Sequence, residues 1–279
     1  MPESRYGLAC RRIARSSRAL AEDEPDTGDP ASPPSHPPLP GRGTRAEAHE
    51  GSEIAANASS IPERPRTPSP RDAAPRRAAF LDRDGVINVD HGYVWRQEDF
   101  DFVPGVLQAA AALHERGYLL VVATNQSGIG RGRYSEAQFH ALTGWMRERF
   151  AAAGAPLAGV YFCPHHPTDA VGAYRTPCPC RKPEPGMLLA AARDLDLDLS
   201  RSVFFGDTAN DLVAARAAGI PARVLLGKDG AAIPPAPAER GLATALYRDL
   251  AAAVCAGDFG SIEPARHGAA RCGIESADD

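Results

Sequence analysis

The chain contains 279 residues and carries a net charge of −4, with a pI of about 6.1. That balance gives no overall positive field to attract nucleic acid, so we expect no nucleic-acid partner. The longest strongly apolar run, Tyr118 to Ala123, is far shorter than the ~20 residues that span a bilayer, and we expect no membrane association. No early segment has the apolar centre of a secretory signal, which favours a cytoplasmic protein.

Composition divides the chain near residue 78. Residues 1–77 hold 13 of the 26 prolines but only one of the 18 aromatic residues, Tyr6. A segment so poor in bulky apolar side chains cannot offset the entropy of ordering its backbone. We therefore predict a disordered arm rich in proline and arginine over 1–77, a single domain over 78–228, and an extension over 229–279 with a short helix and a polar tail. We expect the protein to be a monomer.

From residue 78 onward, short apolar runs alternate with segments of helical periodicity. Strands are predicted at 78–81, 118–123, 160–162, 202–205 and 222–226. Helices are predicted over 104–116, 135–152, 185–195 and 209–218, with a further short helix near 242–254. The alternation predicts right-handed crossovers and a Rossmann-like α/β fold, in which helices cover both faces of a parallel sheet.

Acidic residues follow two of these strands, at the edge where parallel sheets bind ligands. Asp82 and Asp84 follow the first strand, so that one carboxylate can attack an electrophile while the other transfers protons. Asp207 and Asp211 follow the fourth strand and offer the hard oxygen ligands that Mg²⁺ prefers.

Phosphate-binding groups follow the other predicted strands. Thr124 and Asn125 supply a hydroxyl and amide hydrogens, and Lys182, in an Arg-rich chain with only two lysines, supplies a compact cation for phosphoryl oxygens. Each feature alone is common in solvated turns and on surfaces. Their order at successive strand ends favours an enzyme of phosphoryl transfer.

Three of the six cysteines cluster after the strand at 160–162, which in a reducing compartment favours a metal over a disulfide. With one histidine they form two close pairs separated by 12 residues, a set suited to tetrahedral Zn²⁺: Cys163, His165, Cys178 and Cys180. His166 is an alternative ligand, and reduced thiols without metal are the alternative to the site itself. Four protein ligands leave no position for water, so we predict a structural zinc that fixes the loop before Arg181 and Lys182.

Four segments together resemble the haloacid dehalogenase superfamily of aspartate-nucleophile phosphatases: 80–88, 124–128, 181–183 and 206–211. The resemblance implies that Asp82 forms an aspartyl-phosphate and that Asp84 is the general acid and base. It implies Mg²⁺ bound by Asp82, the backbone carbonyl of Asp84 and Asp207. It also implies that Thr124 and Lys182 hold the transferred phosphoryl group.

Spacing leaves no room for the separate cap domain that many of these phosphatases carry. Only 39 residues lie between Asp84 and Thr124, and a loop with one helix accounts for them. We therefore expect a capless fold in which small insertions at 88–102 and 163–180 determine specificity.

Within that superfamily, segments 88–94, 125–132, 163–167 and 180–187 resemble the bacterial D-glycero-D-manno-heptose 1,7-bisphosphate 7-phosphatases. The resemblance implies a sugar bisphosphate substrate and a place in nucleotide-activated heptose synthesis for lipopolysaccharide. Arg131 and Arg181, with Asn125 beside them, would bind the phosphate that is retained. Thr208 stands where these enzymes usually carry a basic residue, which leaves the sugar and anomer preference open. A histidinol-phosphate phosphatase is the nearest alternative. A scaffold without activity is disfavoured because the catalytic residues are intact.

Overall fold

The computed structural model describes residues 11–12, 76–230, 241–257 and 259. These residues belong to one of two units into which the chain divides, and the other unit, 16–73, lies outside them. Our prediction of a disordered arm over 1–77 therefore falls mostly outside the described residues, as does the predicted polar tail. The predicted domain limits stay a prediction.

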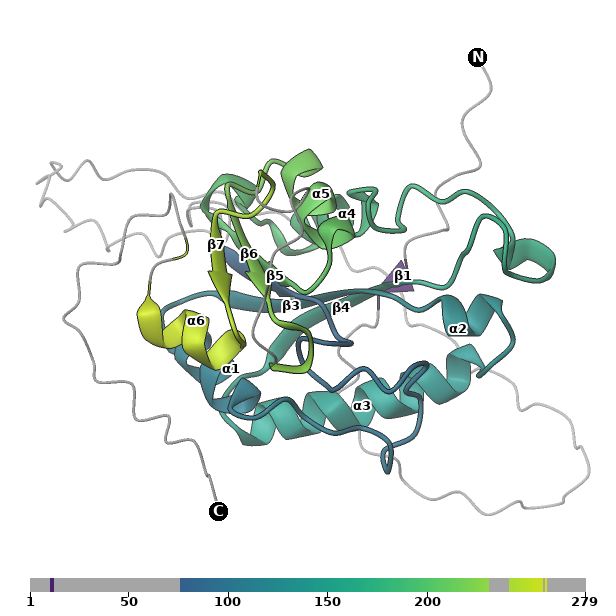
Figure 1. The fold of residues 1–279 in the computed structure, drawn as a ribbon, viewed down its shortest axis with the longest axis horizontal. Coiled ribbons are helices and arrows are strands. Elements are labelled where there is room, and N and C mark those ends of the chain that lie inside the picture. The colour runs from purple at the N-terminus through teal and green to yellow at the C-terminus, as the bar shows by residue number, and fades with distance from the viewer. Residues whose placement is uncertain (1–10, 13–75, 231–240, 258, 260–279) are drawn as a thin grey trace, which may run out of the picture. The chain divides into compact units, whose positions relative to one another are not determined.

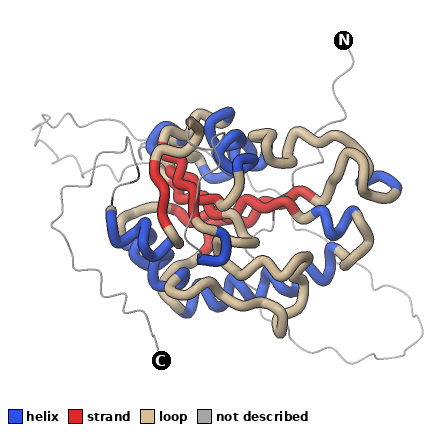
Figure 2. The backbone as a smooth tube through the Cα atoms, viewed as in Figure 1, coloured by secondary structure: helices blue, strands red, loops and turns tan. Residues whose placement is uncertain are grey.

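Within the described residues, seven strands form one sheet in the order β1-β4-β3-β2-β5-β6-β7 (Figure 2). Six of them run parallel, and β1 pairs antiparallel with β4 at one edge. The strands are β1 (Arg11–Arg12), β2 (Ala78–Leu81), β3 (Leu119–Asn125), β4 (Leu157–Cys163), β5 (Val203–Gly206), β6 (Ala222–Leu226) and β7 (Ala245–Tyr247).

Helices cover both faces of this sheet, as predicted (Figure 1). Helices α1, α3 and α6 pack against one face, and α4 and α5 against the other. The helices are α1 (Val106–Glu115), α2 (Ser127–Gly130), α3 (Glu136–Ala152), α4 (Gly186–Leu195), α5 (Ala209–Ala217) and α6 (Leu250–Ala256), with 3₁₀ turns at Gly172–Tyr174, Leu199–Arg201 and Lys228–Gly230.

The burial of strand β2 shows why the central strands appear in the sequence as continuous apolar runs. Its four residues are all fully buried, and alternate side chains enter the two core layers. Ala79 and Leu81 belong to the layer under α1 and α3, whereas Ala78 and Phe80 belong to the layer under α4 and α5. A central parallel strand has no solvent face, so both of its faces must be apolar.

The helix α3 begins where its sequence signal predicts. Ser135 is the N-cap, and its Oγ accepts a hydrogen bond from the backbone N–H of Gln138 over 3.2 Å. The Gln138 side chain in turn accepts from the Ser135 N–H over 2.8 Å, which completes a capping box. The longest helix of the described residues is this one, and none there is long and apolar enough to cross a membrane.

The predicted helix near 242–254 is wrong over its first half. Residues Ala245–Tyr247 instead form β7, which pairs in parallel with β6. Asp249 then caps α6, its carboxylate accepting from the Ala252 N–H over 2.7 Å. A short strand beside a distant partner leaves no helical or alternating pattern of its own, so tertiary pairing decides the outcome. The extension thus adds strand β7 to the sheet of residues 78–226 and helix α6 to the layer that covers it.

Candidate active site

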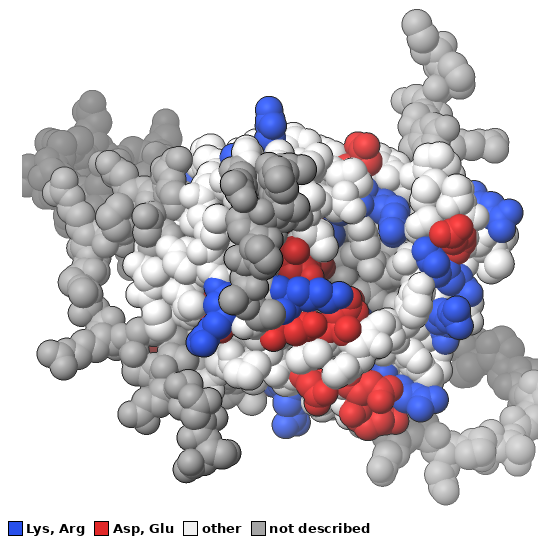
Figure 3. Space-filling model, viewed as in Figure 1, with Lys and Arg blue, Asp and Glu red and all other residues white. Residues whose placement is uncertain are grey.

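The carboxyl ends of neighbouring strands bring the four predicted motifs together. In the register of the sheet, Leu81 of β2 lies between Val122 of β3 and Phe205 of β5. Asp82 and Asp207 therefore leave adjacent strands at the same edge. Acidic and basic side chains gather near the middle of the face seen in Figure 3.

Lys182 is buried within this cluster, with 2% of its surface exposed. Its Nζ lies 2.9 Å from Asp82 Oδ1 and 2.6 Å from Asp211 Oδ1. It also donates to the backbone carbonyl of Ala123 over 2.8 Å. Burial opposes its charge, but the two carboxylates outweigh burial and raise the pKa of Lys182. The side chain is therefore a fixed cation at the carboxyl edge of the sheet.

Three carboxylates converge beside this lysine. Oxygen atoms of Asp82, Asp207 and Asp211 all lie within 4.8 Å of one another. Burial raises the pKa of Asp82 to about 7, although the charge of Lys182 acts in the opposite direction. Burial, with the charges of Asp82 and Asp211, raises the pKa of Asp207 to about 8. So many buried negative groups need a cation or protons to compensate them.

The surroundings of Asp207 fit a small metal ion. Its Oδ1 is buried and has no hydrogen-bond partner among the described residues. Gly85 leaves space beside it, since a Cβ at Gly85 would lie 2.3 Å from Asp207 Oδ2. Asp211 is engaged differently, because its Oδ2 accepts from the Thr208 hydroxyl over 2.7 Å while its Oδ1 faces Lys182. Asp82 and Asp207 thus offer the oxygen donors that suit Mg²⁺.

Competition between protons and metal at these carboxylates predicts a pH-dependent stabilisation. Burial in the folded protein raises the pKa of Asp82 to about 7 and that of Asp207 to about 8, both above the ordinary value for an aspartate. The metal-free fold therefore binds protons more tightly than the unfolded chain and loses stability as pH rises from about 4 to 8. We expect Mg²⁺ to raise the Tm by several degrees more at pH 8.5 than at pH 6. Thermal unfolding with and without Mg²⁺ measures this difference, and an equal Mg²⁺ effect at both pH values would contradict it.

Asp84 is held by a set of nitrogen donors. Arg83, 1% exposed, binds it through Nε over 3.1 Å to Oδ1 and through Nη2 over 2.7 Å to Oδ1 and 2.9 Å to Oδ2. Asn88 Nδ2 donates to Oδ1 over 3.1 Å, and Gln126 Nε2 donates to Oδ2 over 3.0 Å. Arg83 Nη2 also reaches the carbonyl of Val94 in the predicted insertion 88–102. Our prediction from sequence did not include these donors.

Thr124 and Asn125 have different surroundings. Thr124 is buried and its Oγ1 accepts from Gln126 Nε2 over 2.8 Å. The amide of Asn125 pairs with the backbone of Lys182, accepting from its N–H and donating to its carbonyl, each over 3.0 Å. In this structure Asn125 therefore positions Lys182, and our prediction that it contacts substrate stays a prediction.

Arg131 and Arg181 are close enough to influence each other. Burial lowers the pKa of Arg181, and the charge of Arg131 lowers it further. Arg181 Nη1 donates to the carbonyl of His165 over 3.1 Å, and Arg131 Nη2 pairs with Asp169 over 3.2 Å. A surface hollow of about 390 Å³ includes Arg131 in its wall and is lined by Arg131, Gly132, Arg133, Asp169, Ala170, Val171 and Arg175. Cationic side chains thus dominate its wall.

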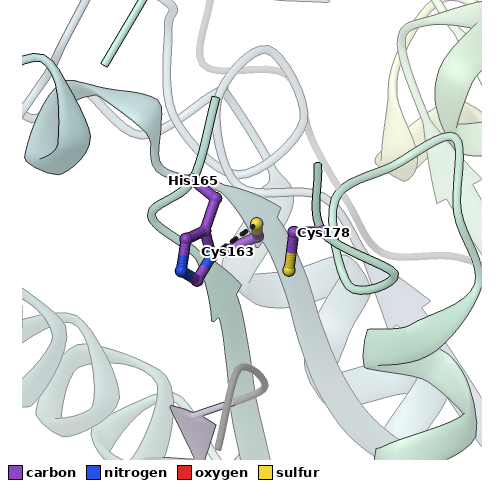
Figure 4. A group of neighbouring side chains, drawn as sticks. All are labelled: Cys163, His165 and Cys178. Carbon is purple, nitrogen blue, oxygen red and sulfur yellow. Dashed lines mark hydrogen bonds between the residues drawn. The ribbon is translucent and has the colours of Figure 1, made fainter. Parts of the chain in front are cut away.

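The loop after β4 gathers three of the four predicted zinc ligands (Figure 4). Donor atoms of Cys163, His165 and Cys178 lie within 4.8 Å of one another, with Cys163 Sγ 3.7 Å from His165 Nδ1. A hydrogen bond from Cys163 lowers the pKa of Cys178 to about 2. Cys180 is buried nearby and donates its N–H to Cys178 Sγ over 3.4 Å, but its sulfur is not part of the three-atom group.

The alternative ligand His166 is not part of this three-atom group. Its Nδ1 accepts from the backbone N–H of Asp169 over 2.9 Å within its own loop. The choice of His165 over His166 as zinc ligand stays a prediction, as does Cys180 as the fourth ligand.

Comparison with known proteins gives a consistent set of relatives. Residues 70–219 match the family model described as haloacid dehalogenase-like hydrolase. The chain is 54% identical over 149 residues to the D-glycero-beta-D-manno-heptose-1,7-bisphosphate 7-phosphatase of Vibrio cholerae, covering 53% of this chain and 80% of the relative. It is 51% identical over 150 residues to the D-glycero-alpha-D-manno-heptose-1,7-bisphosphate 7-phosphatase of Burkholderia mallei, covering 54% and 79%.

Solved structures agree with the sequence relatives. The D,D-heptose 1,7-bisphosphate phosphatase from B. bronchiseptica, complexed with magnesium and phosphate, is 35% identical with a TM-score of 0.53, covering 64% of this chain and 96% of that one. A HAD-like phosphatase from Mesorhizobium loti is 36% identical with a TM-score of 0.55, covering 62% and 81%. The similarity therefore extends over most of each relative.

Proposed function

Because the chain belongs to the haloacid dehalogenase-like hydrolase family, we propose that it is a Mg²⁺-dependent phosphatase of D-glycero-D-manno-heptose 1,7-bisphosphate. It removes the 7-phosphate in the synthesis of nucleotide-activated heptose. The observation that carries this proposal is the meeting of Asp82, Lys182 and Asp207 at one sheet edge, in a chain about half identical to phosphatases of that name. We propose that the enzyme acts as a cytoplasmic monomer.

The reaction proceeds in two steps through Asp82 and Asp84. Asp82 attacks phosphorus, the bond from phosphorus to the sugar oxygen breaks, and Asp84 gives its proton to that oxygen. Asp84 then takes a proton from the water that attacks the aspartyl-phosphate, which releases phosphate and restores Asp82. Thr124 and Lys182 bind the phosphoryl oxygens throughout.

Mg²⁺ fits the oxygen donors of Asp82 and Asp207 together with the backbone carbonyl of Asp84. When bound, it neutralises charge that develops on the phosphoryl oxygens. Without it, Lys182 is the cation nearest to Asp82 in the described residues. Burial keeps the pKa of Asp82 raised to about 7 despite Lys182, so protons compete with Mg²⁺ for the nucleophile near neutral pH.

The phosphate that is retained requires its own cations. Arg131 and Arg181 supply them, with Asn125 as a neighbouring hydrogen-bonding group. Planar guanidinium groups suit phosphate because they donate two parallel hydrogen bonds. On this assignment we expect the enzyme to prefer a bisphosphate to a monophosphate.

A kinetic panel tests the substrate. It compares both anomers of heptose 1,7-bisphosphate with histidinol phosphate, fructose 1,6-bisphosphate and glyceraldehyde 3-phosphate. We expect kcat/KM to be highest for a heptose bisphosphate, and the panel decides the anomer, since relatives of both names exist. A clear preference for histidinol phosphate would overturn the assignment in favour of that phosphatase.

We propose that Cys163, His165, Cys178 and Cys180 bind one structural Zn²⁺. The three clustered donors have the residue types and closeness of a tetrahedral site. We expect about one equivalent of zinc in the purified protein, as metal analysis measures it. His165→Ala should lower the zinc content and the Tm, because a structural zinc contributes directly to folding.

The neighbouring histidine offers a matched control for the zinc experiment. His166→Ala removes the same side chain from the same loop but leaves the sulfur cluster intact. We expect it to retain the full zinc content. Equal zinc loss in both variants, or zinc-free wild-type protein, would contradict the site.

A further inference from the structure

A buried chain of hydrogen bonds connects Tyr134 to Asp84 and Thr124. The Tyr134 hydroxyl donates to Gln126 Oε1 over 2.5 Å. The Gln126 amide nitrogen donates to Asp84 Oδ2 over 3.0 Å and to Thr124 Oγ1 over 2.8 Å. Gln126 is 1% exposed and Tyr134 6% exposed, so water does not compete for these bonds. These hydrogen bonds connect Asp84, the proposed proton-transfer group, with Thr124, the proposed phosphoryl-binding group.

The partners of Gln126 fix the orientation of its amide. The Tyr134 O–H donates to the carbonyl oxygen of Gln126, so the NH₂ group faces Asp84 and Thr124. Gly128 permits this contact, because a Cβ there would lie 2.3 Å from the Tyr134 ring. The Tyr134 hydroxyl thus holds the amide in the one orientation that serves Asp84.

This orientation determines what Thr124 can do. A threonine hydroxyl has one hydrogen to donate and two lone pairs that accept. Because Thr124 Oγ1 accepts from Gln126, its own hydrogen remains available for a phosphoryl oxygen. The amide therefore turns Thr124 into a donor toward the substrate.

The same amide acts on one particular oxygen of Asp84. Oδ1 accepts from three donor atoms, namely Nε and Nη2 of Arg83 and Nδ2 of Asn88. Oδ2 accepts from two, Arg83 Nη2 and Gln126 Nε2. Oδ2 has fewer donors than Oδ1, so a transferable proton displaces fewer hydrogen bonds at Oδ2. Gln126 is the only one of these side chains that contacts Oδ2 alone.

We propose that Gln126, held by Tyr134, is a positioning residue that aligns Asp84 for proton transfer to the leaving group and Thr124 for phosphoryl binding. This inference rests on the proposed phosphatase function. As Asp82 bonds to phosphorus and the phosphorus–oxygen bond to the leaving group breaks, the proton on Asp84 Oδ2 moves to the leaving oxygen. The products are the aspartyl-phosphate at Asp82, the alcohol, and the ionised carboxylate of Asp84, which the Gln126 amide stabilises.

Two substrates with different leaving groups test this role. Heptose 1,7-bisphosphate releases an alkoxide that needs a proton, whereas p-nitrophenyl phosphate releases a stable phenolate that does not. We expect Tyr134→Phe to lower kcat/KM for the bisphosphate about 10-fold, and Gln126→Met on the order of 100-fold. For p-nitrophenyl phosphate, which loses only the alignment of Thr124, we expect smaller losses in kcat/KM, about tenfold in Gln126→Met and no more than about threefold in Tyr134→Phe. KM for the bisphosphate should change less than kcat.

Tyr161→Phe provides a matched control. Tyr161 is equally buried, but its hydroxyl donates to Asp194 over 3.1 Å, and its ring lies in the opposite core layer. We expect this variant to behave like the wild type on both esters. Equal losses on both esters in Tyr134→Phe and Gln126→Met would indicate a merely structural role and overturn the inference. So would unchanged kinetics in both. A wild-type enzyme that hydrolyses neither ester would overturn the proposed function, and the inference with it.

Discussion

The Asp82→Asn variant should release phosphate at least about 10⁴-fold more slowly than the wild type, because an amide cannot form the aspartyl-phosphate. The substitution changes almost no volume and removes one negative charge from a crowded cluster. We therefore expect the folded structure to persist, with a Tm equal to or above that of the wild type. Phosphate release in the presence of Mg²⁺ and thermal unfolding measure the two effects.

Asp196→Asn is the control for this prediction. Asp196 ends helix α4 in a left-handed conformation that asparagine also adopts, so the same change there should leave both activity and stability near wild type. Turnover in Asp82→Asn at the wild-type rate would rule out a covalent intermediate at Asp82.

Lys182→Met should cause the second-largest loss. The variant keeps an unbranched side chain but leaves Asp82 and Asp211 without the cation that lies 2.9 Å and 2.6 Å from them. Removing one member of a buried ion pair costs about 3–5 kcal/mol of folding free energy. Loss of a cation at the phosphoryl group should lower kcat/KM by about 10³-fold. Denaturant unfolding and steady-state kinetics measure these effects separately.

The stability loss in Lys182→Met should depend on pH. Without the lysine, Asp82 takes up a proton more readily, which relieves the unpaired charge at pH 6 but not at pH 8.5. The other lysine provides a contrast, because Lys228 has 59% of its side chain exposed and its ion pair with Asp90 lies at the surface. Lys228→Met should cost less than about 1 kcal/mol. A similar cost for both lysines would contradict the buried role of Lys182.

The sequence was sufficient to predict the α/β fold because its central strands are buried on both faces. Such strands must be apolar throughout, and each ends abruptly at a polar residue, as β2 does at Asp82. The position of Lys182 could also be predicted, because a lysine is rare in this chain. The pairing of its backbone with Asn125 could not, since that contact joins residues 57 positions apart.

The support around Asp84 could not be predicted for a similar reason. Arg83 is the adjacent residue in the sequence, but an arginine is usually exposed, and nothing in the sequence indicates that this one is buried against Asp84. Gln126 lies within the motif at 124–128, but Tyr134, which orients it, carries no signal of its own. Strand β7 has three residues and pairs, among the described strands, only with β6, so it is too short to show the alternation that predicts a strand.

The parallel pairing of β6 with β7 determines where this protein can be shortened. A chain ending after Lys228 would leave backbone groups of β6 unpaired along an open edge, among them the Arg223 carbonyl, which now accepts from the Thr244 N–H over 2.8 Å. It would also uncover the apolar side of α1, where Leu250 and Val254 of α6 are now fully buried. Exposed edges and uncovered apolar surfaces both promote aggregation. The catalytic carboxylates all precede residue 212, yet soluble expression of an active fragment requires the chain at least to Ala256.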